Sequence, residues 1–144
     1  MKTIALRFAD NFAPKCGTIE AHRKMIEKNG FVWYGKLGNS VSSKVAEEIL
    51  SNEECKILLI HSGKINRYWA KIVEIDSQIN DDENIPEYYR DTKNKFKTWF
   101  KVTSIEEAKR DVMSKCTIAS SGAPLSEISK HSMSPYFIIN YIEE

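Results

Sequence analysis

The chain has few of the features that mark secreted, zinc-binding or membrane-spanning proteins. Its 144 residues include three cysteines, Cys16, Cys55 and Cys116, an odd number with no Cys-x-x-Cys pair. This spacing indicates neither a disulfide framework nor a zinc site, and we expect a reducing, cytoplasmic environment. The N-terminal stretch MKTIALRFADNF contains Arg7 and Asp10, which is typical of neither a signal peptide nor a membrane span. We therefore expect a soluble protein with no membrane partner.

An excess of charge and the common catalytic motifs are also missing. The net charge is +1, from 21 basic and 20 acidic residues, so composition alone does not indicate an acidic partner. The sequence contains no GxSxG, P-loop, GxGxxG after a strand or HExxH, and its three histidines are scattered. An amidohydrolase-like site of Lys64 or Lys71 with Glu74 is the enzymatic alternative. We expect no cofactor, no metal and no enzymatic activity.

Residues 56–75 predict a β-hairpin at the centre of a single α+β domain that spans residues 1–144. An unbroken apolar run from Ile57 to Ile60 predicts a strand that is buried on both faces. The alternating pattern from Tyr68 to Ile75 predicts its partner strand, with Trp69 near a surface.

Local patterns predict the other elements. Before the hairpin the sequence predicts a half-buried strand at 3–9 and a helix from the cap Thr18 to Asn29 and Gly30. A strand or extended segment at 31–35 and a helix after Ser42 or Ser43 follow. After the hairpin it predicts a surface excursion at 77–86, a helical turn or tight loop at 87–90, a strand at 96–102 and a short helix from the capping-box pattern at Ser104 toward Met113. Residues 114–134 predict no definite element, and residues 136–142 suit a last strand or a short helix.

Basic and aromatic residues alternate in RDTKNKFKTWFK, residues 90–101. Five lysines and arginines stand against one aspartate, with Phe96, Trp99 and Phe100 between them. Such a segment can contact nucleic-acid phosphates. The alternative is a solvated strand edge whose lysines oppose edge-to-edge pairing. Aromatic residues elsewhere, including all three tryptophans, fall at element ends or beside lysines, where they can stack on a planar base or serve as core.

The order of these segments resembles the PUA-like superfamily, in particular its YTH and EVE members. The matching residues are Gly30-Phe31-Val32-Trp33, the hairpin LLIHSGKINRYWAKIVEI, and FKTWFKVTSI as the later strand, which together span residues 3–105. The resemblance implies a strongly bent β-barrel of five or six strands flanked by two or three helices.

The resemblance also implies residue roles. Trp33 would form one wall of an aromatic pocket, Asp10 and Asn11 would touch the base edge, and Tyr88 and Tyr89 stand where YTH proteins often have a tryptophan. Candidate base contacts are Asp10, Asn11, Trp33, Tyr34, Lys36, Ser62, Trp69, Tyr88, Tyr89 and Trp99. Candidate phosphate contacts are Arg67, Arg90, Lys93, Lys95 and Lys97.

The function that the resemblance implies is recognition of a modified, methylated base that is flipped into an aromatic pocket. The partner is nucleic acid, with DNA favoured over RNA. The resemblance extends to N-terminal DNA-reading modules of McrB-like modification-dependent restriction systems, which implies a fused or associated NTPase or nuclease effector. Two alternatives stay open: an ASCH-like amidohydrolase acting on modified nucleosides, and a protein-interaction domain on the same barrel.

Overall fold

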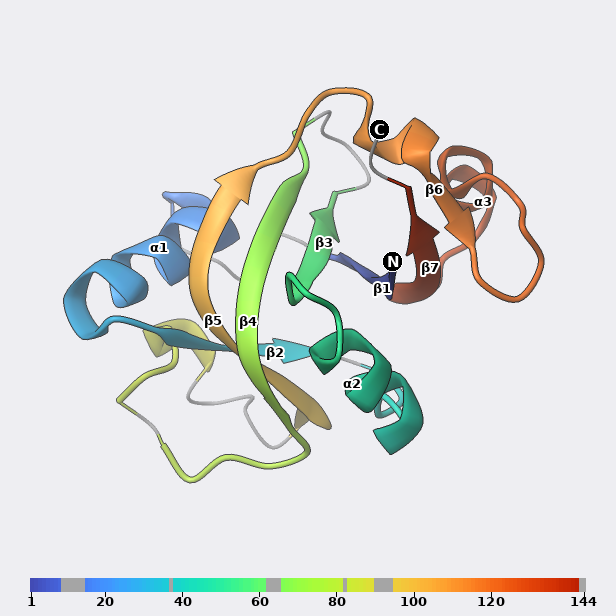
Figure 1. The fold of residues 1–144 in the computed structure, drawn as a ribbon. Helices are drawn as coiled ribbons and strands as arrows, with labels where there is room; N and C mark the ends of the chain where they lie inside the picture. Colours follow the sequence, from blue (N-terminus) through green and yellow to red (C-terminus); the bar gives the residue numbers. More distant parts are fainter. Residues whose placement is uncertain (9–14, 37, 62–65, 82, 90–94, 143–144) are drawn as a thin grey trace.

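One bent sheet of seven strands forms the framework of the part of the chain that the structure describes (Figure 1). The structure is a computed structural model, and it describes residues 1–8, 15–36, 38–61, 66–81, 83–89 and 95–142. The strands are β1 (Lys2–Arg7), β2 (Val32–Lys36), β3 (Lys56–Ile60), β4 (Tyr68–Asp76), β5 (Thr98–Glu107), β6 (Cys116–Ile118) and β7 (Tyr136–Tyr141). The helices are α1 (Gly17–Asn29), α2 (Ser43–Leu50) and α3 (Leu125–His131), with 3-10 turns η1 (Glu87–Tyr89) and η3 (Val112–Lys115).

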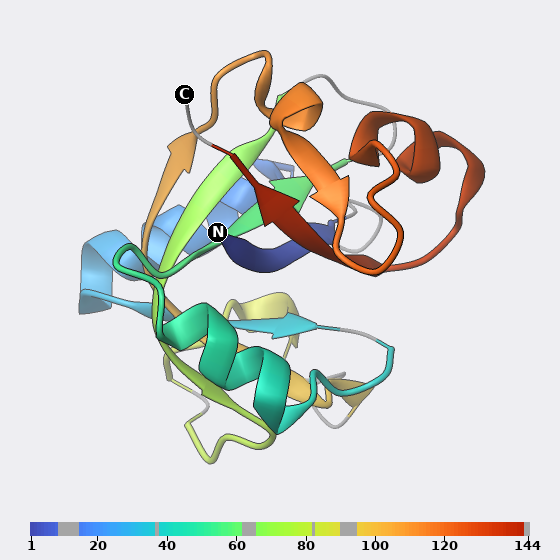
Figure 2. The same cartoon turned by 45° about the vertical axis from the view of Figure 1, so that its right-hand side comes forward.

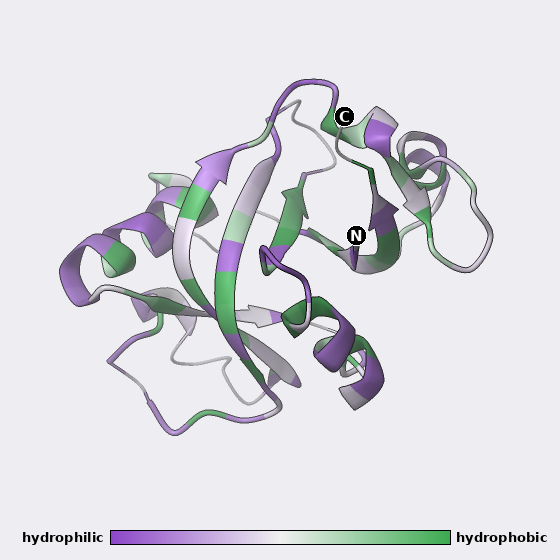
Figure 3. Ribbon diagram, viewed as in Figure 1, coloured by the Kyte–Doolittle hydropathy of each residue, from purple (hydrophilic) through white to green (hydrophobic). Residues whose placement is uncertain are grey.

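The strand order is β2-β5-β4-β3-β1-β7-β6, and the hydrophobic β3 lies at its centre (Figure 3). Strands β1 and β3 are parallel, and the other neighbours are antiparallel. Every residue of β3 is buried, and β3 pairs with β4 through Leu58 and Trp69, which confirms the predicted hairpin. The structure thus has the α+β architecture expected for a bent PUA-like barrel.

The long strands β4 and β5 carry the bend. Their register shifts between Lys71 and Ile72 and again between Ile72 and Glu74, and such irregularities increase the local bend and twist of a strand pair. The sheet consequently has two halves, with β2 and α2 in one and β1, β7, β6 and α3 in the other (Figure 2).

Three hydrophobic clusters stabilise this arrangement. The central cluster joins the inner faces of β1, β2, β3 and β5 to helices α1 and α2 through residues such as Leu6, Ile49 and Phe100. A second cluster lies on the opposite face of β1, β3 and β7 and packs against η3 and α3. A third, aromatic cluster lies on the outer face of β2 and β5. Its buried members are Trp33, Ile85, Tyr89 and Trp99.

The prediction of a helix beginning at Ser104 is wrong, because Ser104–Glu107 continue strand β5. These residues pair with β4 from Lys71 back to Tyr68, and Ile105 joins the central cluster. Pairing with a neighbouring strand and burial of Ile105 outweigh the local capping-box signal. The helical turn comes later, at Val112–Lys115.

Several predicted boundaries also need correction. Strand β1 is buried on both faces and not on one, because Ile4 and Leu6 pack into the central cluster while Ala5 packs into the second cluster. Helix α1 begins at Gly17 with Cys16 at the N-cap, and Thr18 lies inside it. Strand β5 begins at Thr98, two residues after the predicted start. The excursion at 77–86 is not wholly at the surface, because Ile85 and Pro86 are buried.

The C-terminal residues, for which the sequence predicts no single element, contain the two strands at one edge of the sheet. Residues 136–141 are the strand β7 between β1 and β6, which excludes the short helix as an alternative. Residues 114–134 contain the end of η3, strand β6 and helix α3. The predicted C-terminal end of α1 is confirmed at Gly30, which has the left-handed conformation with a φ of 87°. The predicted start of α2 is confirmed at Ser42, whose hydroxyl accepts a hydrogen bond from the Val45 N–H.

Candidate nucleic-acid interface

The aromatic cluster on the outer face of β2 and β5 begins with two tryptophans. Trp33 on β2 pairs with Lys101, and Trp99 on β5 pairs with Gly35. Because side chains alternate along a strand, Trp33, Gly35, Trp99 and Lys101 share one face of the sheet. The registry therefore brings together two tryptophans that lie 66 positions apart in the sequence.

Tyr89 and Phe96 complete the cluster from outside the sheet. The rings of Tyr89 and Phe96 have centroids 4.8 Å apart, and Phe96 meets Trp99 at 5.1 Å with an interplanar angle of 74°. Tyr89 meets Trp99 edge-to-face at 6.0 Å. The Tyr89–Phe96 pair is tilted, and the two pairs with Trp99 have the edge-to-face arrangement that aromatic rings favour. Tyr89 is held by η1, where its N–H donates to the carbonyl oxygen of Pro86.

The cluster is closed by its own side chains. Trp33 is 7% exposed, Tyr89 6% and Trp99 2%, and Ile85 packs among them. Gly35 makes the close packing possible, because a Cβ there would lie 2.7 Å from the Phe96 ring and 3.0 Å from Trp99. A planar ligand can therefore contact the tryptophan faces only if Tyr89 or Phe96 moves aside.

His22 connects this cluster to the central core. Its ring lies 4.5 Å from the Tyr34 ring and 5.3 Å from the Tyr89 ring. Nδ1 is 2.8 Å from the carbonyl oxygen of Thr18, and since a carbonyl only accepts, Nδ1 carries the proton. Burial lowers the pKa of His22 to about 4, against the Thr18 hydrogen bond, which raises it. His22 is therefore a core histidine, fully buried within α1.

Two further candidates, Tyr34 and Lys36, face the other side of β2. Tyr34 belongs to the central cluster. The Lys36 ammonium donates to the carbonyl oxygen of Asn39 and lies 3.8 Å from the centroid of the Tyr136 ring. Burial lowers the pKa of Lys36 to about 8. The structure therefore separates these two residues from Trp33 and Trp99.

Trp69 is separated from the aromatic cluster as well. It packs against the second hydrophobic cluster, with its ring 4.9 Å from the Tyr141 ring and 4.5 Å from the Lys56 ammonium. Of the candidate base contacts, the structure brings together Trp33, Tyr89 and Trp99. Asp10, Asn11 and Ser62 lie outside the described residues, as does the side chain of Tyr88.

Basic residues adjoin the aromatic cluster. Lys95 and Lys97 are exposed on either side of Phe96 in the chain. The Lys101 ammonium lies 4.4 Å from the centroid of the Phe31 ring, which meets Trp33 edge-to-face at 6.4 Å. Arg67 is half-buried directly before β4, while Arg90 and Lys93 lie outside the described residues.

Sequence patterns alone did not identify Phe31, Ile85 and Phe96 as neighbours of the tryptophans. Their only signal was the alternation of aromatic and basic residues around Phe96. For the enzymatic alternative, Lys71 forms an ion pair with Glu54 at 3.9 Å, and Lys64 lies outside the described residues. Among the residues that the structure describes, no group of three or more His, Cys, Asp or Glu side chains is placed to hold a metal ion.

The comparison with known families agrees with this geometry. A family model described as Pua-like matches residues 4–138, almost the whole chain, and the protein therefore belongs to the Pua-like family. Membership of this family points to a module that binds nucleic acid or a modified base. No curated protein and no solved structure matches the chain. No helix in the described ranges has the length and apolar character required to cross a membrane.

Proposed function

We propose that this domain recognises a modified, methylated base in nucleic acid by taking it out of its stack and placing it against the aromatic cluster. The observation that carries the proposal is the convergence of Trp33, Tyr89 and Trp99, from three separate segments, in a domain of the Pua-like family. Base flipping costs a few kcal/mol. Stacking on an aromatic side chain contributes about 1–3 kcal/mol per base, and phosphate contacts add to it.

The two sides of the cluster have different roles in this proposal. Trp33 and Trp99 belong to paired strands and form the fixed wall. Tyr89 lies in a three-residue 3-10 turn and Phe96 outside any strand, so these side chains move at lower cost. The modified base replaces their contacts with the tryptophans, and Lys95, Lys97 and Lys101 neutralise the adjacent phosphates.

DNA is the favoured partner over RNA in this proposal, and the domain serves as a recognition module without enzymatic activity of its own. Cleavage would then come from a fused or associated NTPase or nuclease. The support is the resemblance of the Trp33 segment and of the central hairpin to DNA-reading modules of restriction systems. Affinity for DNA and RNA oligonucleotides of the same sequence tests the preference directly.

Binding of a matched oligonucleotide set tests base recognition. The set carries adenine, N6-methyladenine, cytosine, 5-methylcytosine or 5-hydroxymethylcytosine at one position, and fluorescence anisotropy gives each dissociation constant. We expect one modified base to be preferred over its plain counterpart. Equal affinity for every modified and plain pair would contradict the proposal.

The variant Trp33→Leu locates the recognition site. Trp33→Ala is unsuitable, because truncating so buried a tryptophan should cost about 3–5 kcal/mol of stability. Trp33→Leu keeps an apolar side chain but removes the flat ring, and should reduce the preference for the modified base. Trp69→Leu is the matched control, since Trp69 lies in another cluster and should leave the preference unchanged. Thermal melting shows that both variants are folded.

A further inference from the structure

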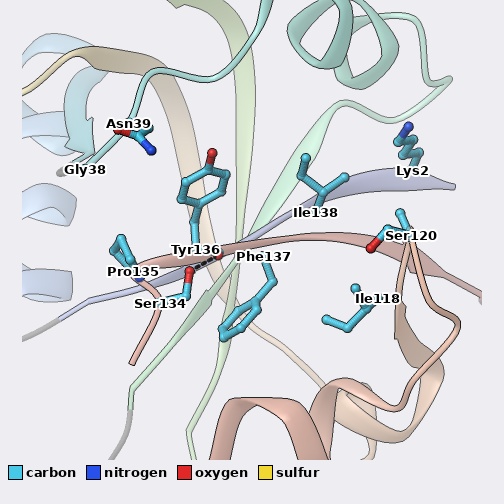
Figure 4. Close-up of a pocket in the computed structure, with 11 residues that line it drawn as sticks. Lys2, Gly38, Asn39, Ile118, Ser120, Ser134, Pro135, Tyr136, Phe137 and Ile138 are labelled. Carbon is cyan, nitrogen blue, oxygen red and sulfur yellow. Dashed lines mark hydrogen bonds between the residues drawn. The ribbon is translucent and has the colours of Figure 1, made fainter. Parts of the chain in front are cut away.

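A cavity of about 620 Å³ lies away from the aromatic cluster, beside strand β7 (Figure 4). Its volume is in the range of sites that bind small molecules. Tyr136 and Ile138 project into it from the same face of β7, Gly38 and Asn39 lie near the Tyr136 end, and Lys2 and Ser120 lie at the other (Figure 4). Gly38, Asn39, Ser120 and Pro135 are exposed, so this β7 groove is open to solvent.

The β7 groove combines an aromatic surface with positive charge. The half-buried Tyr136 ring is held in place by the Lys36 ammonium, 3.8 Å from its centroid. At the other end the Lys2 side chain is 36% exposed and forms an ion pair with Glu48 at 2.8 Å. The lining residues, all within the described ranges, include no aspartate or glutamate. The groove therefore suits a flat ring attached to an anionic group that competes with Glu48 for Lys2.

The two sides of the β7 groove are joined to each other. A Cβ at Gly38, where φ is +84, would lie 3.0 Å from Cγ of Pro135, so the loop after β2 touches the segment before β7. Arg7 stabilises that segment by donating to the carbonyl oxygens of Ser129, Ser132 and Ser134. The groove is therefore formed before any ligand binds, which lowers the cost of binding.

We propose that the β7 groove holds a second, unmodified nucleotide of the bound strand, with its base against Tyr136 and Ile138 and its phosphate near Lys2. This inference rests on the proposed function. Lys36, which contacts Tyr136, lies three residues beyond Trp33 on β2, or about 10 Å along the strand. A stacked nucleic-acid strand advances about 3.4 Å per nucleotide. Because Lys36 and Trp33 face opposite sides of β2, which is the edge strand of the sheet, the bound strand would pass around this edge, and the β7 groove should take a base a few positions from the modified one.

The variants Tyr136→Leu and Tyr136→Phe test the aromatic contact. Tyr136→Leu should weaken binding of modified and plain single strands equally, by about 5- to 150-fold. Tyr136→Phe keeps the ring and should bind like the wild type. Tyr68→Leu is the control, because Tyr68 also packs against the central cluster but does not line the groove, and it should not change affinity. Unlike Trp33→Leu, Tyr136→Leu should leave the ratio of modified to plain affinity unchanged, so the two proposals can fail separately.

Abasic oligonucleotides identify which nucleotide the groove holds. An abasic site placed at each position in turn, up to four on either side of the modified base, should weaken wild-type binding at one position. On that oligonucleotide Tyr136→Leu should cause no further loss, because the two changes remove the same contact. Independent losses from Tyr136→Leu and from every abasic site would overturn the assignment.

The charges at Lys2 and Glu48 provide a paired test. Lys2→Gln removes the proposed phosphate contact and should weaken binding several-fold. Glu48→Gln releases Lys2 from its ion pair and should strengthen binding. If Tyr136→Leu and Lys2→Gln are folded and bind single strands with wild-type affinity, nucleic acid does not occupy the β7 groove, and the inference is wrong.

Discussion

The domain should lose stability as the pH falls below the ordinary histidine pKa, because His22 is protonated in the unfolded chain but stays neutral in the folded protein. The pKa of His22 is lowered by burial from 6.5 to about 4 in the folded protein. Between these two values the unfolded chain binds more protons at this site than the folded one. The free energy of unfolding therefore rises with pH across this window and falls on acidification.

The size of the effect follows from the two pKa values. Relative to pH 7.5, the His22 contribution at pH 5 should lower the free energy of unfolding by about 2 kcal/mol. In the variant His22→Gln the side chain does not titrate, and its amide can still donate toward the Thr18 carbonyl. Other titrating groups are common to both proteins, so their contributions cancel in the difference.

Urea unfolding of both proteins at pH 5, 6 and 7.5 measures this difference. From pH 7.5 to pH 5, the free energy of unfolding of the wild type should fall by about 2 kcal/mol more than that of His22→Gln. A difference between the two proteins that is the same at all three pH values would refute the reasoning and show that His22 is not desolvated.

Two further predictions concern the aromatic cluster and its basic flank. Gly35→Ala should lower the free energy of unfolding by about 1–3 kcal/mol, because its Cβ would press on Phe96 and Trp99, and combining it with Phe96→Leu should recover part of the loss. Chemical denaturation measures both, and a neutral Gly35→Ala would show that the packing is looser. Lys95→Ala combined with Lys97→Ala should weaken single-strand binding and reduce the slope of log affinity against log salt by about 1.4, since each phosphate contact contributes about 0.7. An unchanged slope would mean that these lysines form only a solvated edge.

The closed aromatic cluster links stability to binding. Under the proposed function, a flipped base would replace the packing to which Tyr89 and Phe96 contribute. Part of the stacking energy would then be used to displace these rings, which would lower affinity for plain bases. Only a base that gains additional contact, such as a buried methyl group, would bind tightly.

Local sequence patterns determined the central hairpin, the first two helices and the short strand that contains Trp33. These elements depend on apolar periodicity, on the N-cap Ser42 and on Gly30, all of which act within a few residues. The Pua-like architecture could be predicted from their order. A core or boundary position for His22 could also be predicted, because it lies on or beside the apolar stripe of its helix.

Tertiary structure alone decided which aromatic residues meet. The pairing of β2 with β5 sets Trp33 and Trp99 on one face, while Trp69, in an equally aromatic stretch, faces another cluster. Strand β5 extends through Ser104 because β4 supplies hydrogen-bonding partners that no local pattern reveals. The β7 groove likewise exists only because Gly38 meets Pro135, 97 positions later in the chain. Contacts between distant segments depend on strand registry and on the bend of the sheet, and neither is encoded within a window of a few residues.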